Sequence, residues 1–359
     1  MNFTGAGMKL FSPLRIRETE LKNRIVVSPM CEYSAKDGHP QTWHLVHLGS
    51  RAIGGAGLVF TEASAVEERG RISSADAGIY KDAHVASWRP IAEFIRSHGA
   101  VPGMQLAHAG RKASTAPPWT GGKPVSVQDG GWEPVGPSAL AFDTGYTVPH
   151  ELSKGEIEEI VAAFQKSAER ALEAGFEVIE IHAAHGYLLH QFLSPLSNAR
   201  TDEYGGKFEN RIRLTMQVAR TVRAAWPQRL PLFVRVSATD WKEGGWGLAQ
   251  TIELARQLKP QGVDLMDVSS GGAVPGVKIP LGPGYQTGFA EAIRKETGIA
   301  TGAVGMINEP AQAETILATE QADLVFLARE LLRDPYWPRR AAKALDVKIK
   351  APVQYERAW

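Results

Sequence analysis

Short apolar runs and longer helical patterns alternate along almost the whole chain, and this alternation limits the fold more than any other feature. Eight runs of six or seven residues are mostly apolar, as expected for parallel strands buried on both faces. They lie at 24–30, 57–63, 101–107, 178–183, 232–238, 265–270, 300–305 and 324–329. Eight repeats without a break in composition predict an α/β chain with one domain over 1–359, a closed (β/α)8 or TIM barrel. A doubly wound open sheet is the alternative.

Helical spacing of apolar residues fills most of the segments between these runs. Ser153 and Glu156 form the S-x-x-E pattern of a capping box, and the amphipathic stretch that follows ends at Gly175. Helices are also expected over 208–226, 251–262 and 310–321.

Two segments fall outside the alternation. Residues 1–23 precede the first run, and 10–23 have the pattern of a hairpin that could close the floor of the barrel. Residues 108–152 are rich in Gly, Pro and Trp and are much longer than an ordinary connection. We expect an extended, ordered lid there.

Composition excludes several classes of partner. Forty Lys and Arg stand against 39 Asp and Glu with no long run of one sign, so neither nucleic acid nor a basic membrane anchor is expected. The single cysteine, Cys31, cannot supply the thiolates of an iron–sulfur cluster or a structural zinc site. No 18-residue apolar run and no signal peptide are seen, and a free thiol suits a reducing compartment, so we expect a cytoplasmic protein.

Polar residues gather where the predicted strands end, which is where β/α barrels place catalytic groups. The first five strands carry or lead into Ser28, Pro29, Met30, Cys31, Glu32, Tyr33, Glu62, Ala63, Gln105, His108, His182, His185, Tyr187 and Arg235. The last three end in Ser269-Ser270-Gly271-Gly272, in Gly302 to Gly305 and in Ala328-Arg329.

The last three ends suggest a phosphate site. Glycine-rich turns such as Gly271 and Gly305 let backbone N–H groups approach a phosphate, and Arg329 adds a charged donor. The alternative is that the glycines serve turn geometry alone and that Arg329 makes a surface ion pair. No G-x-G-x-x-G or Walker sequence is present.

His182, His185 and Tyr187 can be interpreted in several ways. The two histidines could bind a metal, but the other strand ends lack the carboxylates that a hydrolytic metal site needs, and Arg235 would oppose a cation. Neutral imidazoles can instead donate N–H groups to a carbonyl or nitro oxygen, or simply hold a loop. Tyr187 is either a proton donor or an aromatic lid residue.

Cys31 has no neighbouring base among the residues beside it in the sequence, so a nucleophilic role cannot be judged. A polarisable thiol against an electron-rich cofactor is one interpretation, and a buried inert thiol is the other.

Four segments together resemble the old yellow enzyme family over nearly the whole chain. They are LKNRIVVSPMCEYSA (21–35), QLAHAGRKAS (105–114), IEIHAAHGYLLHQFLSPLSNARTDEYGG followed by FENR (179–211), and DLVFLARELLRDPYWP (323–338). Cys31 after Pro-Met, the histidine pair and the terminal APVQYERAW (351–359) resemble the thermophilic-like bacterial branch, whose members are FMN-containing ene-reductases.

The resemblance implies FMN as cofactor, NADPH or NADH as reductant, and reduction of the C=C bond of α,β-unsaturated carbonyl or nitro compounds. It implies no metal. The residues implied to bind the flavin ring are Ser28, Pro29, Met30, Cys31, Ala63, Gln105 and Arg235. Those implied at the phosphate are Ser270, Gly271, Gly305, Ala328 and Arg329, where relatives often carry glycine in place of Ala328. Those implied at the substrate are Tyr33, His182, His185 and Tyr187, with Tyr187 as the proton donor.

Arg357 resembles the family's arginine finger, which enters the active site of a neighbouring subunit. The tail over 345–359 would then make the working unit a homodimer or homotetramer, whereas the alternative is a disordered tail. Tyr355 and Trp359 beside Arg357 favour docking. Two other enzymatic functions stay open: a dihydroorotate-type FMN barrel with Cys31 as base, and a metal-dependent barrel hydrolase.

Overall fold

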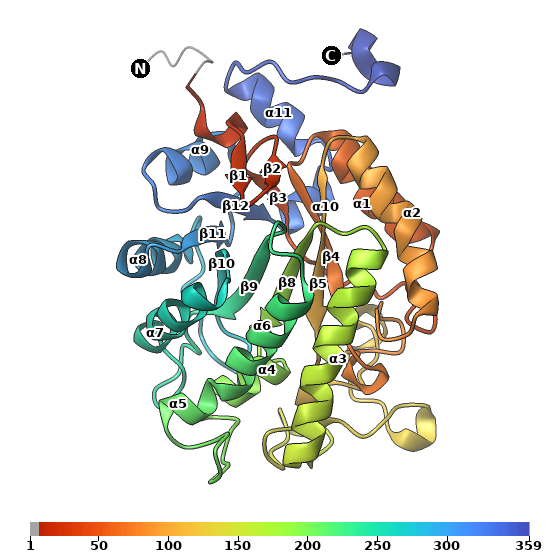
Figure 1. Cartoon of the computed structure of the whole chain (residues 1–359), viewed down its shortest axis with the longest axis vertical. Helices are drawn as coiled ribbons and strands as arrows, with labels where there is room; N and C mark the ends of the chain where they lie inside the picture. The colour runs from red at the N-terminus through yellow and green to blue at the C-terminus, as the bar shows by residue number, and fades with distance from the viewer. Residues whose placement is uncertain (1–6, 359) are drawn as a thin grey trace.

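The computed structural model describes residues 7–358, and its centre is one closed barrel of eight parallel strands (Figure 1). In chain order the strands are β3 (Ile25–Val27), β4 (Leu58–Ala65), β5 (Val101–Ala107), β8 (Val178–Ala183), β9 (Leu232–Ser237), β10 (Leu265–Ser269), β11 (Ala300–Val304) and β12 (Leu324–Leu327). All eight predicted strands are confirmed, and the closed ring excludes the open sheet. The first and last strands are shorter than expected, so Ser28 and Arg329 lie beyond their ends.

Helices surround the barrel, as Figure 1 shows. The longer ones are α1 (Thr42–Gly54), α2 (Ala83–Ser97), α3 (Lys154–Glu173), α6 (Arg213–Ala225), α7 (Leu248–Leu258), α8 (Thr287–Thr297), α9 (Pro310–Ala318) and α11 (Trp337–Ala344). Short helices are α4 (Leu188–Leu193), α5 (Phe208–Arg211) and α10 (Arg329–Arg333). The capping box at the start of α3 is confirmed, since Ser153 Oγ accepts from the Glu156 backbone N–H and the Glu156 side chain accepts from Ser153 N–H. The helix expected over 208–226 is divided at Ile212.

Each strand presents alternate residues to the two sides of the barrel wall. Ile179, Val234 and Met266 face outward into the core shared with the helices. The inward-facing residues near the strand starts form a second apolar cluster, in which Phe60 stacks on Phe326 with ring centroids 6.2 Å apart. The half of the barrel at the strand starts is therefore filled with side chains.

A hairpin closes the floor, as predicted. Strands β1 (Leu14–Ile16) and β2 (Thr19–Leu21) pair antiparallel, and Leu21 belongs to the apolar cluster inside the barrel. The floor is therefore sealed by the hairpin and by the side chains above it.

The segment 108–152 lies at the end of the barrel opposite the hairpin (Figure 1). It is built from short 3-10 turns and the two-residue strands β6 (Val135–Gly136) and β7 (His150–Glu151). Arg111 Nη2 donates to the Ala273 carbonyl at 2.7 Å, and Trp132 Nε1 donates to the Arg69 carbonyl at 2.8 Å. These bonds attach the segment to loops that follow other strands, so it frames the mouth.

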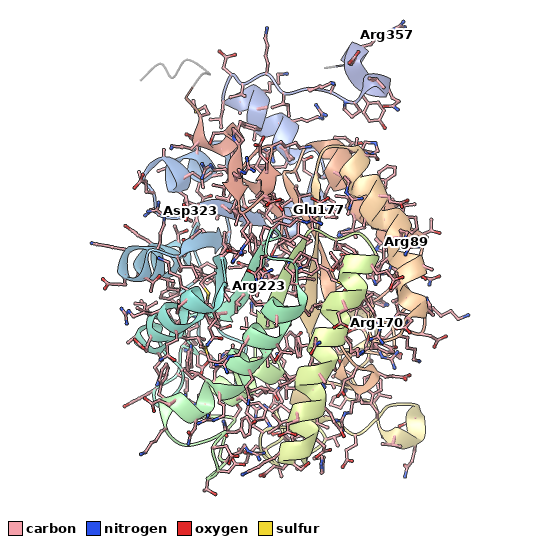
Figure 2. The ribbon with its side chains drawn as sticks, viewed as in Figure 1. Arg89, Arg170, Glu177, Arg223, Asp323 and Arg357 are labelled. Atoms are coloured by element: carbon pink, nitrogen blue, oxygen red, sulfur yellow. The ribbon has the colours of Figure 1, made fainter. Side chains whose placement is uncertain are left out.

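The C-terminal tail lies at the floor end, far from the lid, and carries Arg357 (Figures 1 and 2). Its last turn is a 3-10 helix over Val353–Ala358, and Trp359 lies outside the described residues. No helix in residues 7–358 is long and apolar enough to cross a membrane.

Candidate active site

Strand alternation places polar residues directly above the apolar floor. Val178 faces the interior, so Glu180 and His182, two and four residues further along β8, face it too. On β9, Phe233 is followed in the same way by Arg235. His182 and Arg235 are register neighbours, so the structure brings these two predicted residues together.

A buried layer of polar side chains spans the barrel at this level. Gln105 Nε2 donates to Glu180 Oε1 at 2.8 Å. Arg235 Nε lies 3.1 Å from Asp267 Oδ2, and its Nη1 donates to Ser28 Oγ at 3.1 Å. Burial raises the pKa of Glu180 well above its usual value, with the charge of Asp267 adding to this, and burial raises the pKa of Asp267 to about 6 against the effect of Arg235.

Glu180 and Asp267 were missed by sequence reasoning. The signal was available, because each is a carboxylate inside an otherwise apolar strand. Glu180 Oε2 and Asp267 Oδ1 are buried without a hydrogen-bond partner among the described residues, whereas Asp267 Oδ2 is paired with Arg235. Such atoms are costly to bury unless another group satisfies them, which is consistent with a polar ligand at this layer.

Two imidazoles and a phenol meet at the mouth. The ring centroid of His182 lies 5.2 Å from that of His185 and 5.1 Å from that of Tyr187, both edge to face. His185 Nε2 lies 2.7 Å from Ser269 Oγ, whereas His182 Nδ1 is buried with no partner in the described part of the chain. The predicted grouping of these three residues is therefore present in the structure.

The protonation states of this group follow from burial. Burial lowers the pKa of both His182 and His185 well below 6.5, and the positive charge of Arg235 lowers them further, so both imidazoles are neutral. Burial raises the pKa of Tyr187 well above 10, with smaller effects from negative groups nearby, so its phenol stays protonated. Lys112 Nζ lies 4.9 Å above the Tyr187 ring.

The turn carrying His185 is held by a very close approach of two backbones. His185 has a φ of 58°, and its carbonyl accepts a hydrogen bond from Lys112 Nζ at 2.8 Å. On the facing loop, Gly272 has a φ of +90°, and a Cβ there would lie 2.6 Å from His185 Cα. Only glycine fits between these loops without displacing the histidine.

Cys31 and Tyr33 lie beyond β3, on the same side of the mouth. Burial raises the pKa of Cys31 well above its usual value, with the charges of Asp76 and Glu62 adding to this. A neutral thiol of this kind is a poor base, which argues against the dihydroorotate-type alternative. Burial and the Cys31 group likewise raise the pKa of Tyr33, whose ring meets that of Trp119 edge to face at 5.7 Å.

A separate cavity of about 380 Å³ opens after the last three strands. Predicted residues on its wall are Gly305, Ala328 and Arg329. Arg333 and Glu330 also line it and pair with each other, with 2.6 Å between Nη2 and Oε2. Arg333 was missed because no motif in the sequence points to a second arginine one helical turn after Arg329. Gly305 has a φ of +120°, and a Cβ there would lie 2.8 Å from Gln286 Nε2.

Ser270 and Gly271, also predicted for the phosphate, lie in the loop beside this cavity. Ser270 Oγ donates to Gln286 Oε1 at 2.5 Å. Gly271 N–H donates to the Thr239 carbonyl at 2.8 Å, and the Gly271 carbonyl accepts from Ser237 Oγ at 2.8 Å. These three polar groups are therefore already engaged within the chain, and the contact of both residues with phosphate stays a prediction.

These two regions fit the two ends of FMN. A cavity lined by Arg329 and a glycine turn suits a phosphate. The layer of Gln105, Arg235 and unpartnered carboxyl oxygens suits a ring edge with both donors and acceptors. Among residues 7–358, no group of three His, Cys, Asp or Glu side chains is arranged to hold a metal ion. Fold and site together define a flavin-binding oxidoreductase barrel.

Comparison with known proteins agrees with this class. The model of the NADH:flavin oxidoreductase / NADH oxidase family matches residues 9–348. NADPH dehydrogenase of Geobacillus sp. (strain WCH70) is 52% identical over 352 residues, covering 98% of each chain. NADPH dehydrogenase of Bacillus subtilis (strain 168) is 50% identical over 353 residues, covering 98% of this chain and 99% of the relative.

Solved structures resemble this chain as well. Morphinone reductase in complex with tetrahydroNAD has a TM-score of 0.78 at 27% identity, covering 96% of this chain and 92% of that one. 2-Naphthoyl-CoA reductase has a TM-score of 0.85 at 28% identity and covers 94% of this chain, which spans only 52% of that longer protein. The chain belongs to the NADH:flavin oxidoreductase / NADH oxidase family, the old yellow enzymes, as the resemblance predicted. It is an oxidoreductase with FMN as cofactor and NAD(P)H as reductant.

Proposed function

We propose that this enzyme reduces the carbon–carbon double bond of α,β-unsaturated carbonyl and nitro compounds, with NADPH as the preferred reductant. The observation that carries the proposal is the grouping of two neutral imidazoles and one protonated phenol at the mouth. When bound, FMN supplies the hydride chemistry, and the protein supplies position and polarisation. The curated relatives named NADPH dehydrogenase favour NADPH over NADH.

His182 and His185 hold the activating oxygen of the substrate. A neutral imidazole has one N–H to donate, and donation to a carbonyl or nitro oxygen stabilises the negative charge that develops there. Because the pKa of both rings lies well below 6.5, neither gains a proton near neutral pH. Tyr33, from the segment after β3, assists them.

Tyr187 donates the proton. Its pKa lies well above 10, so its Oη carries a proton throughout the working range of pH. The α-carbon becomes strongly basic once hydride has reached the β-carbon, and the phenol protonates it there. The phenolate that remains must regain a proton before the next turnover.

The cofactor would be held by residues from all parts of the chain. Around the ring these are Ser28, Pro29, Met30, Cys31, Ala63, Gln105 and Arg235, and at the phosphate they are Ser270, Gly271, Gly305, Ala328 and Arg329, with Arg333 added from the cavity. Arg235, buried beside Ser28, would stabilise negative charge on the ring.

We further propose that the working unit is a homodimer or homotetramer and that Arg357 completes the site of a neighbouring subunit. Arg357 lies at the floor end, opposite the mouth of its own barrel, so it could serve only another copy (Figure 2). Val353 in the same turn is 70% exposed, which gives the tail an apolar side for docking. The free thiol of Cys31 supports the proposed cytoplasmic location.

Tyr187→Phe tests the assignment of the acid. We expect stopped-flow reduction of the flavin by NADPH to stay near the wild-type rate, while reoxidation by an enone slows by about 10²–10⁴-fold, the range for loss of a general acid. Tyr204→Phe is the matched control. Its hydroxyl lies away from the mouth and donates to Gln217 Oε1 at 3.1 Å. Equal slowing of both half-reactions in Tyr187→Phe would remove it from this role.

A further inference from the structure

Asp76 is a buried carboxyl group beside Tyr187 that has no role in the site described above. It lies in the loop between β4 and α2 and is 1% exposed. Its Oδ1 accepts from Ser73 Oγ and its Oδ2 accepts from the Ile72 backbone N–H, both at 2.7 Å. These bonds fix the carboxyl in place.

Asp76 and Tyr187 line the same cavity, which has a volume of about 10 Å³. That volume is close to the room one water molecule needs. The rest of the wall is apolar or glycine and consists of Ala63, Ala65, Gly70, Ile72, Ala107 and Ala109. The carboxyl group and the tyrosine are therefore the two titratable side chains on this wall.

The groups that interact electrostatically with Asp76 come from three elements. Glu62 comes from β4, Cys31 and Tyr33 from the segment after β3, and Tyr187 from the turn before α4. Burial raises the pKa of Asp76 to about 7, the charge of Glu62 adds to this, and the bonds from Ser73 and the Ile72 backbone oppose it. Asp76 can therefore hold a proton near neutral pH and exchange it.

The other groups at the mouth are poorly suited to reload Tyr187. The pKa of Cys31 and that of Tyr33 are raised, so both keep their protons. His182 and His185 are neutral and carry no spare proton. The remaining rival is Lys112.

Burial, with the charge of Arg111 adding to it, lowers the pKa of Lys112 to about 8, so it too could exchange a proton. Its Nζ, however, donates to the carbonyls of His185 and Gly272 and lies above the Tyr187 ring face. Asp76 and Tyr187, in contrast, line one cavity, so the carboxyl group has the more direct route for passing a proton to Tyr187.

We propose that Asp76 is the residue that returns a proton to Tyr187 between turnovers. The O–H bond of the Asp76 carboxylic acid breaks and an O–H bond forms at the Tyr187 phenolate oxygen, directly or across one water molecule. The Asp76 carboxylate then takes a proton from a solvent acid, and no electrons move. This inference rests on the proposed role of Tyr187 as the acid.

The test compares the first turnover with the steady state in Asp76→Asn holoenzyme. The first reoxidation by an enone starts with Tyr187 protonated, so we expect a rate within about twofold of wild type, whereas steady-state kcat falls about tenfold or more. We also expect a small acid such as acetic acid to restore kcat of the variant with rising concentration and to leave wild type unchanged. The kcat of wild type should fall as the pH rises through about 7, because the Asp76 carboxyl group then loses its proton. The kcat of Asp76→Asn should not show this fall.

Ser74→Ala is the matched control, because this exposed side chain lies in the same loop and the change leaves the Asp76 carboxyl group and both of its hydrogen bonds in place; kcat should stay near that of wild type. A readout free of turnover is the infrared C=O band of a protonated carboxylic acid. The difference between wild type and Asp76→Asn should contain a band that disappears as the pH rises through about 7.

The outcomes separate this inference from the proposed function. If Asp76→Asn keeps wild-type kcat, if its first turnover slows as much as its steady state, or if acetic acid restores nothing, the Asp76 proposal is wrong. A normal kcat for Asp76→Asn together with a low one for Lys112→Met would assign the proton to Lys112 instead. If Tyr187→Phe reoxidises at the wild-type rate, the assigned acid itself is wrong.

Discussion

Gly272 controls the position of His185, and Gly272→Ala should therefore damage the chemistry more than the fold. A Cβ at this position would lie 2.6 Å from His185 Cα, whereas ordinary contacts begin at 3.4 Å, so the two loops would have to separate by about 0.8 Å. The backbone atoms on both sides cannot rotate away as a side chain could. A misplacement of about 1 Å near a reacting centre costs about 10²-fold in rate, so we expect kcat/KM for an enone to fall about 10- to 100-fold.

The assay is steady-state enone reduction, with FMN content measured to confirm that the variant is loaded. Gly282→Ala is the control, since a Cβ at Gly282, in the same long loop, would meet no atom within 4 Å. We expect the control to keep wild-type kcat/KM and both variants to keep about one FMN per chain. Wild-type kcat/KM in Gly272→Ala, or an equal loss in Gly282→Ala, would refute the reasoning.

Two further changes address stability and assembly. Burial raises the pKa of Glu67, but the hydrogen bonds and charges of His108 and Arg69 outweigh this and lower it to about 2. The stability that Glu67 contributes is thus present above pH 4.5 and lost as pH falls toward 2. Urea unfolding measures the free energy of unfolding of wild type and of Glu67→Gln. The difference between the two should decrease by about 3 kcal/mol across that window, and a constant difference would contradict this. Arg357→Ala should raise KM for the enone if subunits share sites, and unchanged kinetics in a confirmed oligomer would end the shared-site proposal.

Much of the fold could be predicted from local sequence, because strands and helices of this barrel have distinct periodicities. The helix over 208–226 was predicted without its interruption at Ile212, since propensity there favours continuation and only packing reveals the break. The ends of β3 and β12 were placed too late for a similar reason. The last ladder pair is Val27 with Leu327. The small residues that follow, Ser28 and Ala328, are compatible with a strand, so only the register decides where pairing stops.

The site was predictable where strand alternation applies and not where it is broken. Strict alternation after Phe60 would turn Glu62 inward, but β4 has a register shift between Phe60 and Ala63. Ala63 therefore pairs with Gln105, and Glu62 turns outward to His44, with 2.7 Å between Oε1 and Nε2. A single sequence shows no bulge of this kind.

Asp76 was missed for a different reason. It lies in a loop with no motif, and only the folded chain brings that loop against Tyr187. Long-range contacts of this type depend on how loops pack against one another at the mouth of the barrel, and local periodicity does not encode that packing.

The sealed floor has a kinetic consequence. With Leu21 of the hairpin and the stacked Phe60 and Phe326 filling one end of the barrel, small molecules approach the polar layer from the lid side. Under the proposed function, nicotinamide and alkene would use this one approach in turn. Excess of either one should obstruct the other, so the enzyme should show mutual substrate inhibition and parallel double-reciprocal lines.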